Sequence, residues 1–189
     1  VKIKLLRYFK KMNKNKKGFI IVSLRPLHLK NVNELRDTID QNLLKWIEKI
    51  EYVPLLLPNT HKLENYINNK EIKISGFVIG GGQIDVNSLR YKREKEILKY
   101  SILNKIPTLG ICHGMQMMSF FEGGKLKKIK NHVRKRHKII CNTGSERYPI
   151  KVNSYHDYSI KNLPSNFDIL CTCEKKSIEA IKHRKYKWL

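Results

Sequence analysis

The sequence is poor in acidic residues, in cysteine and in long apolar segments. It has 16 Asp and Glu against 39 Lys and Arg among 189 residues. No apolar run approaches the roughly 20 residues that a transmembrane helix needs, and residues 1–9 lack the apolar stretch of a signal peptide. Four unevenly spaced cysteines do not form the framework of a small secreted disulfide-rich protein. We therefore expect a cytoplasmic protein with reduced thiols and no membrane partner.

The formal net charge of +23 raises nucleic acid as a partner. The basic residues are spread over the whole length, however, and no nucleic-acid-binding motif is present. We therefore do not expect nucleic acid to be the main partner. The positive field instead favours a phosphorylated or nucleotide-bearing small molecule, and no cofactor is predicted. The hydrophobic content of 41% is sufficient for a folded core.

Apolar runs and helical periodicity alternate along the first two thirds of the chain. Strands are predicted at residues 18–24, 52–58, 74–79 and 106–109, and helices at 33–50, 63–67, 89–104 and 115–121. The alternation predicts an α/β fold with a parallel sheet and helices on both faces. In such sheets ligands bind beyond the carboxyl ends of the strands. Short β-like runs follow at 138–141, 148–152, 167–173 and 177–181.

Two boundaries complete this organisation. The strand at 18–24 is expected to end at Arg25-Pro26, and Asn33 is the candidate N-cap of the helix at 33–50. Residues 1–17 are basic and poorly patterned, and we interpret them as an N-terminal extension or linker. No repeats or low-complexity linkers interrupt residues 18–189, which are therefore predicted to form one domain.

A cysteine occupies the turn between the strand at 106–109 and the helix at 115–121. The turn, residues 110–116, is Gly-Ile-Cys-His-Gly-Met-Gln, with Cys112 at its centre. A tight turn leaves no room for large neighbours, and the partial positive charge of a helix N-terminus favours the thiolate. The strand-turn-helix context is the one that a nucleophile motif requires. The competing interpretation is a buried structural cysteine at a strand end.

The pattern Gly-x-Cys-x-Gly-x-Gln resembles the class I glutamine amidotransferases and the related γ-glutamyl hydrolases. The resemblance implies a flavodoxin-like, mostly parallel sheet and Cys112 as the catalytic nucleophile. Acyl transfer also needs oxyanion donors, for which backbone N–H groups are suited. The candidates are the N–H groups of His113 and of Gly81 and Gly82 in a glycine triplet, for which a plain turn is the alternative. By resemblance, Gln116 binds the glutamyl group or supports the turn.

A second stretch resembles the Asn-Ser-x-His signature of the γ-glutamyl hydrolases. It contains Asn153, Ser154, Tyr155 and His156. The resemblance implies that these residues line the pocket for the α-amino and α-carboxyl groups of the substrate. The alternative is a strand-to-turn connection with an incidental histidine.

A basic loop at residues 131–137 contains two histidines five positions apart, His132 and His137. Two such histidines can be metal ligands, but no cysteine or carboxylate lies nearby in sequence, so no metal site is predicted. We expect Arg134, together with Arg25 after the first strand, to bind phosphate through its guanidinium fork. A solvated loop is the alternative. The two cysteines of a later strand, at 171 and 173, are interpreted as core residues.

The sequence departs from the family at one point. The triad of the family is Cys-His-Glu, with the last two residues in a His-Pro-Glu motif, and no such motif occurs in these residues. Two explanations compete, namely a chain that continues beyond Leu189 and a natural loss of the base. We favour the first, because the last residues resemble the approach to that motif.

The predicted activity is hydrolysis of a γ-glutamyl amide through a thioester on Cys112, with release of glutamate. Together with Ser23-Leu24-Arg25-Pro26, the two signatures most resemble the γ-glutamyl-CDP-amidate hydrolases of capsule phosphoramidate biosynthesis. The substrate is then a nucleotide-linked γ-glutamyl small molecule. Two alternatives stay open. One is the glutaminase part of an amidotransferase, which works with a partner biosynthetic enzyme, and the other is a binding module without catalysis.

Overall fold

The computed structural model describes residues 18–130, 132–143, 146–174 and 176–186. The predicted extension at 1–17 lies outside the described residues. The chain divides into two compact units, the first ending at Gly114 and the second beginning at Met115. Within the described residues, no helix is both long and apolar enough to cross a membrane.

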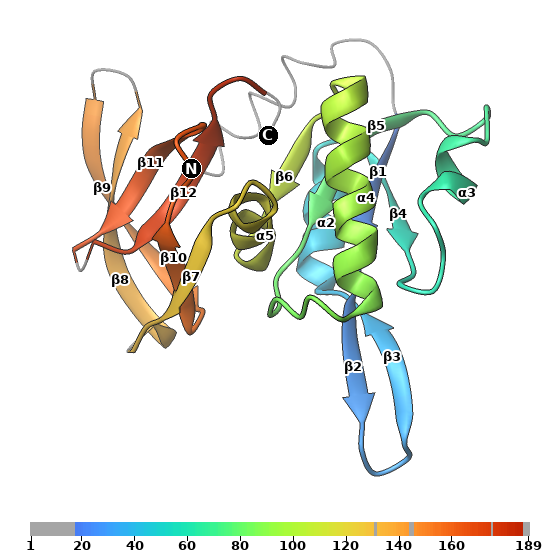
Figure 1. Cartoon of the computed structure of the whole chain (residues 1–189), viewed down its shortest axis with the longest axis horizontal. Helices are drawn as coiled ribbons and strands as arrows, with labels where there is room; N and C mark the ends of the chain where they lie inside the picture. The colour runs from blue at the N-terminus through green and yellow to red at the C-terminus, as the bar shows by residue number, and fades with distance from the viewer. Residues whose placement is uncertain (1–17, 131, 144–145, 175, 187–189) are drawn as a thin grey trace. The chain divides into compact units, whose positions relative to one another are not determined.

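The first unit is built on a four-stranded sheet in the order β4-β1-β5-β6, and all of its strands are parallel (Figure 1). Counted along the chain, these are the second, first, third and fourth parallel strands, which is the flavodoxin-like order. The predicted α/β fold with a mostly parallel sheet is therefore confirmed. The strands are β1 (Phe19–Ser23), β4 (Val53–Leu57), β5 (Ile74–Ile79) and β6 (Thr108–Gly110).

Helices cover both faces of this sheet. Successive side chains of a strand point to opposite faces, so β1 contacts a helix on each side. Ile20 and Val22 of β1 pack with Ile47 of helix α2 (Gln41–Lys49). Ser23 points to the other face, where its hydroxyl donates to Glu94 of helix α4. Helix α4 spans Leu89–Asn104, the predicted bounds, and a short helix α3 spans Glu64–Ile67.

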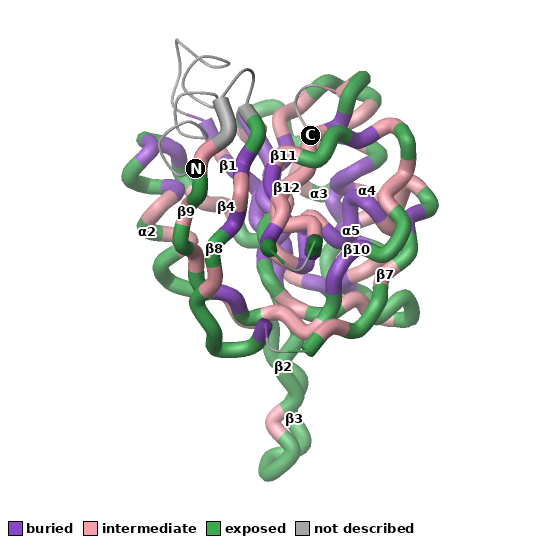
Figure 2. The backbone as a smooth tube through the Cα atoms, turned by 90° about the vertical axis from the view of Figure 1, so that its left-hand side faces the viewer, coloured by how far each residue is buried: buried purple, intermediate pink, exposed green. Residues whose placement is uncertain are grey.

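One predicted helix is wrong in its first half. The chain from Arg25 does not leave the sheet as a loop but forms an antiparallel hairpin of β2 (Arg25–Leu29) and β3 (Glu34–Thr38). Helix α2 begins only after Asp40, whose side chain accepts a hydrogen bond from the Asn42 N–H. Leu35, an apolar residue inside the helix predicted at 33–50, lies on β3 and is 69% exposed. Figure 2 shows that the hairpin is exposed along almost its whole length.

The second unit consists mainly of antiparallel strands. One sheet has the order β12-β11-β8-β9, and a two-stranded sheet joins β10 to β7. The four β-like runs predicted here are confirmed as β8, β9, β11 and β12, whereas the lysine-rich β7 and the short β10 were not predicted. Helix α5 (His113–Phe121) crosses the division between the units. The strands are β7 (Lys125–Lys128), β8 (Val133–Thr143), β9 (Glu146–Tyr155), β10 (Tyr158–Asn162), β11 (Phe167–Cys173) and β12 (Ile178–His183).

Cysteines form much of the core of the larger antiparallel sheet. Cys141 and Cys171 lie directly opposite each other on β8 and β11 and are joined by a disulfide. Together with Cys173 they pack against Ile139 in one buried cluster. The prediction that these cysteines are core residues is confirmed. The expectation that all four thiols are reduced is wrong for Cys141 and Cys171, because strand pairing places them opposite each other.

Candidate active site

Three predicted site segments lie at one edge of the parallel sheet. Arg25 follows the carboxyl end of β1, the glycine triplet Gly80–Gly82 follows that of β5, and Cys112 follows that of β6. The carboxyl ends of parallel strands meet at the same edge, and β1 and β5 flank the point where the strand order reverses. Crevices at such switch points are where these folds bind ligands.

Cys112 sits on a strained turn between β6 and α5. Its φ is 54°, in the left-handed region that a side chain seldom adopts. The turn is anchored to β5, because the Ile111 N–H donates to the Ile79 carbonyl at 2.9 Å. A Cβ on Gly114 would lie 2.1 Å from that same oxygen, so glycine is required there. The half-buried Cys112 keeps its thiol, and the predicted strand-turn-helix context is confirmed.

The glycine triplet turns its carbonyls toward one side chain of α4. Arg90 donates from Nη2 to the Gly80 carbonyl at 3.0 Å and from Nη1 to the Gly81 carbonyl at 3.1 Å. No described peptide bond is cis, and in a trans peptide the N–H points opposite to the carbonyl. The N–H groups of Gly81 and Gly82 therefore point away from Arg90, and their role as oxyanion donors stays a proposal.

A buried set of polar side chains, here called the Glu94 network, holds this turn. Its members are Ser23, Arg90, Glu94 and His113. Glu94 Oε1 accepts from Arg90 Nε at 2.6 Å and from the Ser23 hydroxyl at 2.9 Å, and Glu94 Oε2 lies 2.7 Å from His113 Nε2. The network links the glycine triplet to the residue after the nucleophile. Only the backbone of His113 was assigned a role from the sequence.

The ionisation of Glu94 follows from its partners. Burial alone would raise the pKa of this carboxyl group. The hydrogen bond and charge of His113, together with Arg90, outweigh burial and hold the pKa below its ordinary value. Glu94 is thus a carboxylate with permanent partners. Sequence reasoning missed it because α4 reads as a charged, solvated helix, although Arg90 and Glu94 do have the i, i+4 spacing of an ion pair.

Arg25 lies beside the glycine triplet. A Cβ on Gly82 would point to within 3.6 Å of the Arg25 Cδ, so the stem of the arginine passes this turn. Its exposed position at the start of the hairpin leaves the side chain in contact with solvent. The phosphate-binding role predicted for Arg25 stays a proposal.

Gln116 of α5 is buried and reaches the turn after β9. Its Nε2 donates to the Tyr158 carbonyl at 2.8 Å. The same carbonyl accepts from His156 Nδ1 at 2.9 Å. Gln116 therefore supports the segment that contains the Asn-Ser-x-His signature. The role that the resemblance implies, binding the glutamyl group or supporting the Cys112 turn, stays a prediction.

The other predicted binding residues of the second unit differ in exposure. Asn153 and Tyr155 are exposed, and so is Arg134, which lies on β8 with a left-handed φ of 52°. The Ser154 hydroxyl donates to the His132 carbonyl, so this side chain has a structural partner. His156 is half-buried and points to Glu179, with 3.4 Å between its Nε2 and the carboxylate.

His156 and Glu179 shift each other's ionisation. The interaction with Glu179 raises the pKa of His156 above its ordinary value and outweighs the effect of burial. Burial raises the pKa of Glu179, but the hydrogen bond and charge of His156 outweigh it and leave that pKa lowered. The pair therefore favours an imidazolium beside a carboxylate.

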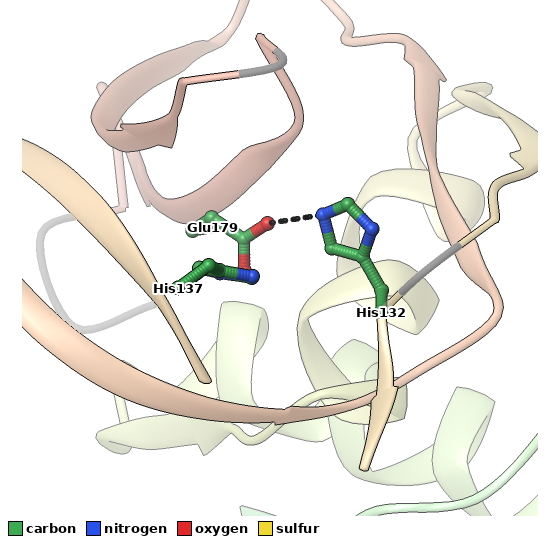
Figure 3. Close-up of side chains that lie close together, drawn as sticks. All are labelled: His132, His137 and Glu179. Atoms are coloured by element: carbon green, nitrogen blue, oxygen red, sulfur yellow. Dashed lines mark ion pairs between the residues drawn. The ribbon is translucent and has the colours of Figure 1, made fainter. Parts of the chain in front are cut away.

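No cysteine or carboxylate lies near His132 and His137 in the sequence, which argued against a metal site, but the fold brings both kinds of residue close to them. Glu179 of β12 lies beside His132 and His137, and the Cys173 sulfur is 3.7 Å from His132 Nε2 (Figure 3). A carboxylate and a thiol are thus both present where the sequence showed neither, because the antiparallel sheet aligns strands that are far apart along the chain.

A sequence profile of the family described as glutamine amidotransferase class-I matches residues 31–189. The chain belongs to the class I glutamine amidotransferase family. Members of this family are amide hydrolases with a cysteine nucleophile that act on small, glutamine-like molecules. Cys112 on its strained turn is the candidate for this nucleophile.

Two curated relatives illustrate the range of the family. The γ-glutamyl-CDP-amidate hydrolase of Campylobacter jejuni is 30% identical over 118 residues, which cover 59% of this chain and 56% of that protein. The glutamine-hydrolyzing GMP synthase subunit of Methanosphaera stadtmanae is 33% identical over 137 residues, which cover 68% of this chain and 67% of that protein. The chain thus spans little more than half of the Campylobacter relative.

Solved structures support the fold. A GMP synthase subunit homologue from Thermoplasma acidophilum superposes with a TM-score of 0.66 at 17% identity, covering 92% of this chain and 82% of that one. A glutamine amidotransferase from Thermotoga maritima gives a TM-score of 0.64 at 17% identity, covering 90% of this chain and 76% of that one. At this identity the likeness shows the class I amidotransferase fold alone.

Proposed function

We propose that Cys112 is the nucleophile of a γ-glutamyl amide hydrolase. Its thiolate attacks the γ-carbonyl carbon, and the N–H groups of Gly81, Gly82 and His113 stabilise the oxyanion. The C–N bond then breaks, the amine leaves with a proton, and water hydrolyses the thioester to release glutamate. We assign the general base to no residue of this sequence, because the sequence contains no His-Pro-Glu motif.

One observation carries this proposal. Cys112 has a left-handed backbone conformation on a turn anchored to Ile79, and the residue after Ile79 begins the glycine triplet. Strain of this kind persists where surrounding contacts over-determine it, and it concentrates at functional sites. A merely structural cysteine has no need of such a turn.

An alkylating glutamine analogue, followed by peptide mapping, tests the nucleophile. We expect labelling at Cys112 and not at Cys173, which is buried, or at the disulfide-bonded pair Cys141 and Cys171. A simple thiol reagent of similar size is the matched control, because it reports exposure alone. Equal labelling of Cys112 and Cys173 by the glutamine analogue contradicts the proposal.

We propose γ-glutamyl-CDP-amidate as the substrate. The support is the match to the Campylobacter hydrolase and the position of Arg25 beside Gly82. The net charge of +23 adds a field that attracts an anionic leaving group. Arg134, Asn153 and Tyr155 are proposed to bind the substrate, together with the backbone groups of Ser154 and His156.

The substrate test compares kcat/KM for γ-glutamyl-CDP-amidate and for glutamine at two salt concentrations. It uses a form of the protein that carries the His-Pro-Glu segment of the family. We expect preference for the nucleotide substrate, a preference that falls as salt rises. Arg25→Ala should reduce it by about tenfold, as expected for one lost charge-assisted hydrogen bond. Arg36→Ala is the matched control, since Arg36 lies on the same hairpin and is paired with Glu34.

The second candidate is the glutaminase subunit of an amidotransferase. It is favoured by the match to the Methanosphaera GMP synthase subunit, which covers more of both chains than the hydrolase match does. Glutamine would then be the better substrate, and activity would depend on a synthase partner. Unchanged preference for the nucleotide substrate in both Arg25→Ala and Arg134→Ala would show that the proposed phosphate site is wrong.

For either enzyme we propose a cytoplasmic location, where Cys112 stays reduced.

A further inference from the structure

A second histidine-rich site lies within the antiparallel sheet of the second unit. We call it the Glu179 cluster and define it by four residues: His132, His137, His156 and Glu179. Glu179 lies 4.0 Å from His132 Nε2, 3.8 Å from His137 Nε2 and 3.4 Å from His156 Nε2. Figure 3 shows the imidazole of His132 and the carboxylate of Glu179 pointing toward each other, with His137 beside them. The proposed hydrolase uses neither Glu179 nor the side chains of His132 and His137.

A β-bulge brings His132 and His137 together. Val133 pairs with Tyr155 and Lys135 with Ser154, so Arg134 is an extra residue without a counterpart on β9. Residues five apart on a regular strand point to opposite faces, because the side-chain period is two. One extra residue restores a common face. The left-handed φ of Arg134 marks the place where this happens.

Backbone carbonyls orient two of the imidazole rings. His132 Nδ1 lies 3.0 Å from the Lys130 carbonyl, and His156 Nδ1 lies 2.9 Å from the Tyr158 carbonyl. A carbonyl oxygen only accepts, so Nδ1 carries the proton in both rings. In the neutral rings the lone pair of Nε2 then faces Glu179. Histidines that bind metals are oriented in this way by a hydrogen bond from the other ring nitrogen.

Two polar atoms in the cluster make no hydrogen bond within the part of the chain that the structure describes. His137 Nε2 and Glu179 Oε1 are buried, and neither has a hydrogen-bond partner among the described residues. Buried polar atoms without a partner are rare and call for an explanation, of which an ion is one. The ligand atoms of His132, His137 and Glu179 lie within 4.8 Å of one another. Around a tetrahedral zinc ion with bonds of about 2.1 Å, ligand atoms are about 3.4 Å apart.

We propose that the Glu179 cluster binds one divalent transition-metal ion, with zinc as the ion that fits best. The ligands are Nε2 of each of the three histidines and one oxygen of Glu179. Imidazole nitrogens with a single carboxylate suit zinc, whereas calcium and magnesium require oxygen ligands. Among His132, His137 and Glu179, contraction by less than about 1.5 Å at each contact gives tetrahedral spacing. His156, whose Nε2 lies 3.4 Å from Glu179, supplies the fourth ligand.

The ion would have a structural role. It would connect β8 and β12 with the end of β9, where the Asn-Ser-x-His signature ends. All four tetrahedral positions would be filled by protein, as in structural rather than catalytic zinc sites. Cys173 is assigned outside the shell, because the three histidines and Glu179 already fill its four positions; its sulfur packs among core residues beside His132.

The test is a titration with Co²⁺ and Zn²⁺ after dialysis against a chelator. All proteins carry Cys112→Ser, so that the nucleophile cannot bind the ion. We expect one ion per chain, the visible absorption of tetrahedral cobalt, and no thiolate-to-cobalt band. Binding of no ion, or a thiolate band that disappears in Cys173→Ser, overturns the proposed ligand set.

Variants assign the ligands. Glu179→Gln should weaken zinc binding by at least about 100-fold, because losing a ligand costs more than the 10–100-fold loss from removing the group behind it. The matched control is His28→Gln with His61→Gln, two exposed histidines outside the cluster, which should leave binding unchanged. If Glu179→Gln does not fold, X-ray absorption of the zinc-loaded parent protein decides. A shell of nitrogen and oxygen supports the proposal, and one that contains sulfur refutes it.

Discussion

Each unit packs one glutamate against histidine, fully buried in the case of Glu94 and partly buried in that of Glu179, but the two glutamates are satisfied differently. Glu94 of the first unit has three side-chain partners within 2.9 Å, one of which is the permanent cation Arg90. Glu179 of the second unit lies 3.4–4.0 Å from three imidazoles and has no arginine or lysine among its ion-pair partners within the described residues. Its Oε1 has no hydrogen-bond partner among the residues that the structure describes.

This difference shows how a buried carboxylate can indicate what it binds. Desolvation of a carboxylate costs several kcal/mol unless a charge and hydrogen bonds offset it. The Glu94 network contains its own cation and fixes a turn of the active site. The Glu179 cluster depends on protonation of a histidine or on an external cation. Glu94 is therefore satisfied by protein groups alone, whereas the surroundings of Glu179 are those of a site that binds a ligand.

The largest expected effect comes from breaking the Glu94 network. Glu94→Ala leaves Arg90 buried without its carboxylate and removes the partner of His113. We expect a loss of about 3–5 kcal/mol in the free energy of unfolding, the usual cost of breaking a buried ion pair on one side. Urea denaturation measures it. Glu34→Ala breaks the exposed pair with Arg36 and should leave the free energy of unfolding nearly unchanged.

The next effect comes from the ion proposed for the Glu179 cluster. Zinc at 100 times its dissociation constant should stabilise the folded protein by about 2.7 kcal/mol, which a chelator removes. The gain should persist in Glu34→Ala and vanish in Glu179→Gln, again on a Cys112→Ser background. Equal stability with and without zinc would remove the proposed distinction between the two glutamates.

The sequence predicted the first unit well for a physical reason. Parallel strands are buried on both faces, so they appear as continuous apolar runs, as β1 and β5 do. Helix α4 was placed at its observed bounds because Ser88 caps it and its chain carries helix-forming residues. The turn at Cys112 was equally predictable from the sequence, because it requires small neighbours at fixed positions.

The errors have physical causes as well. The hairpin of β2 and β3 is exposed, so no burial pattern distinguishes it from a helix, and Leu35 matched the helical spacing by coincidence. The lysine-rich β7 has no apolar alternation that indicates a strand. In each case tertiary pairing decides the structure and local propensity does not.

The polar site residues divide in the same way. Cys112 and the glycine triplet follow from local sequence, whereas Glu94 and Glu179 become meaningful only through partners that are distant along the chain. The bulge at Arg134 is the extreme case. A single unpaired residue determines whether His132 and His137 share a face, and no pattern in the sequence announces it.

A smaller effect separates the two units by pH. The pKa of Glu94 is lowered from 4.5 in the folded protein. The folded state then binds fewer protons than the unfolded state near that pH. The stabilisation is complete above about pH 4.5 and is lost as the pH falls through the folded-state pKa. The destabilisation caused by Glu94→Gln, measured by urea denaturation at a series of pH values, should therefore shrink in acid.

His183 provides the corresponding signal of the second unit, at higher pH. Burial lowers its pKa from 6.5, as does the charge of Lys185, against the opposing charge of Glu122. Its Nδ1 accepts backbone N–H groups of Lys185 and Tyr186, which requires an unprotonated nitrogen. A lowered histidine pKa stabilises fully above about pH 6.5 and ceases to do so as the pH falls through the folded-state value. The cost of His183→Gln, measured in chelator, should thus decline from pH 7 to pH 5, where that of Glu94→Gln is still constant. Parallel pH profiles for the two variants would contradict this assignment.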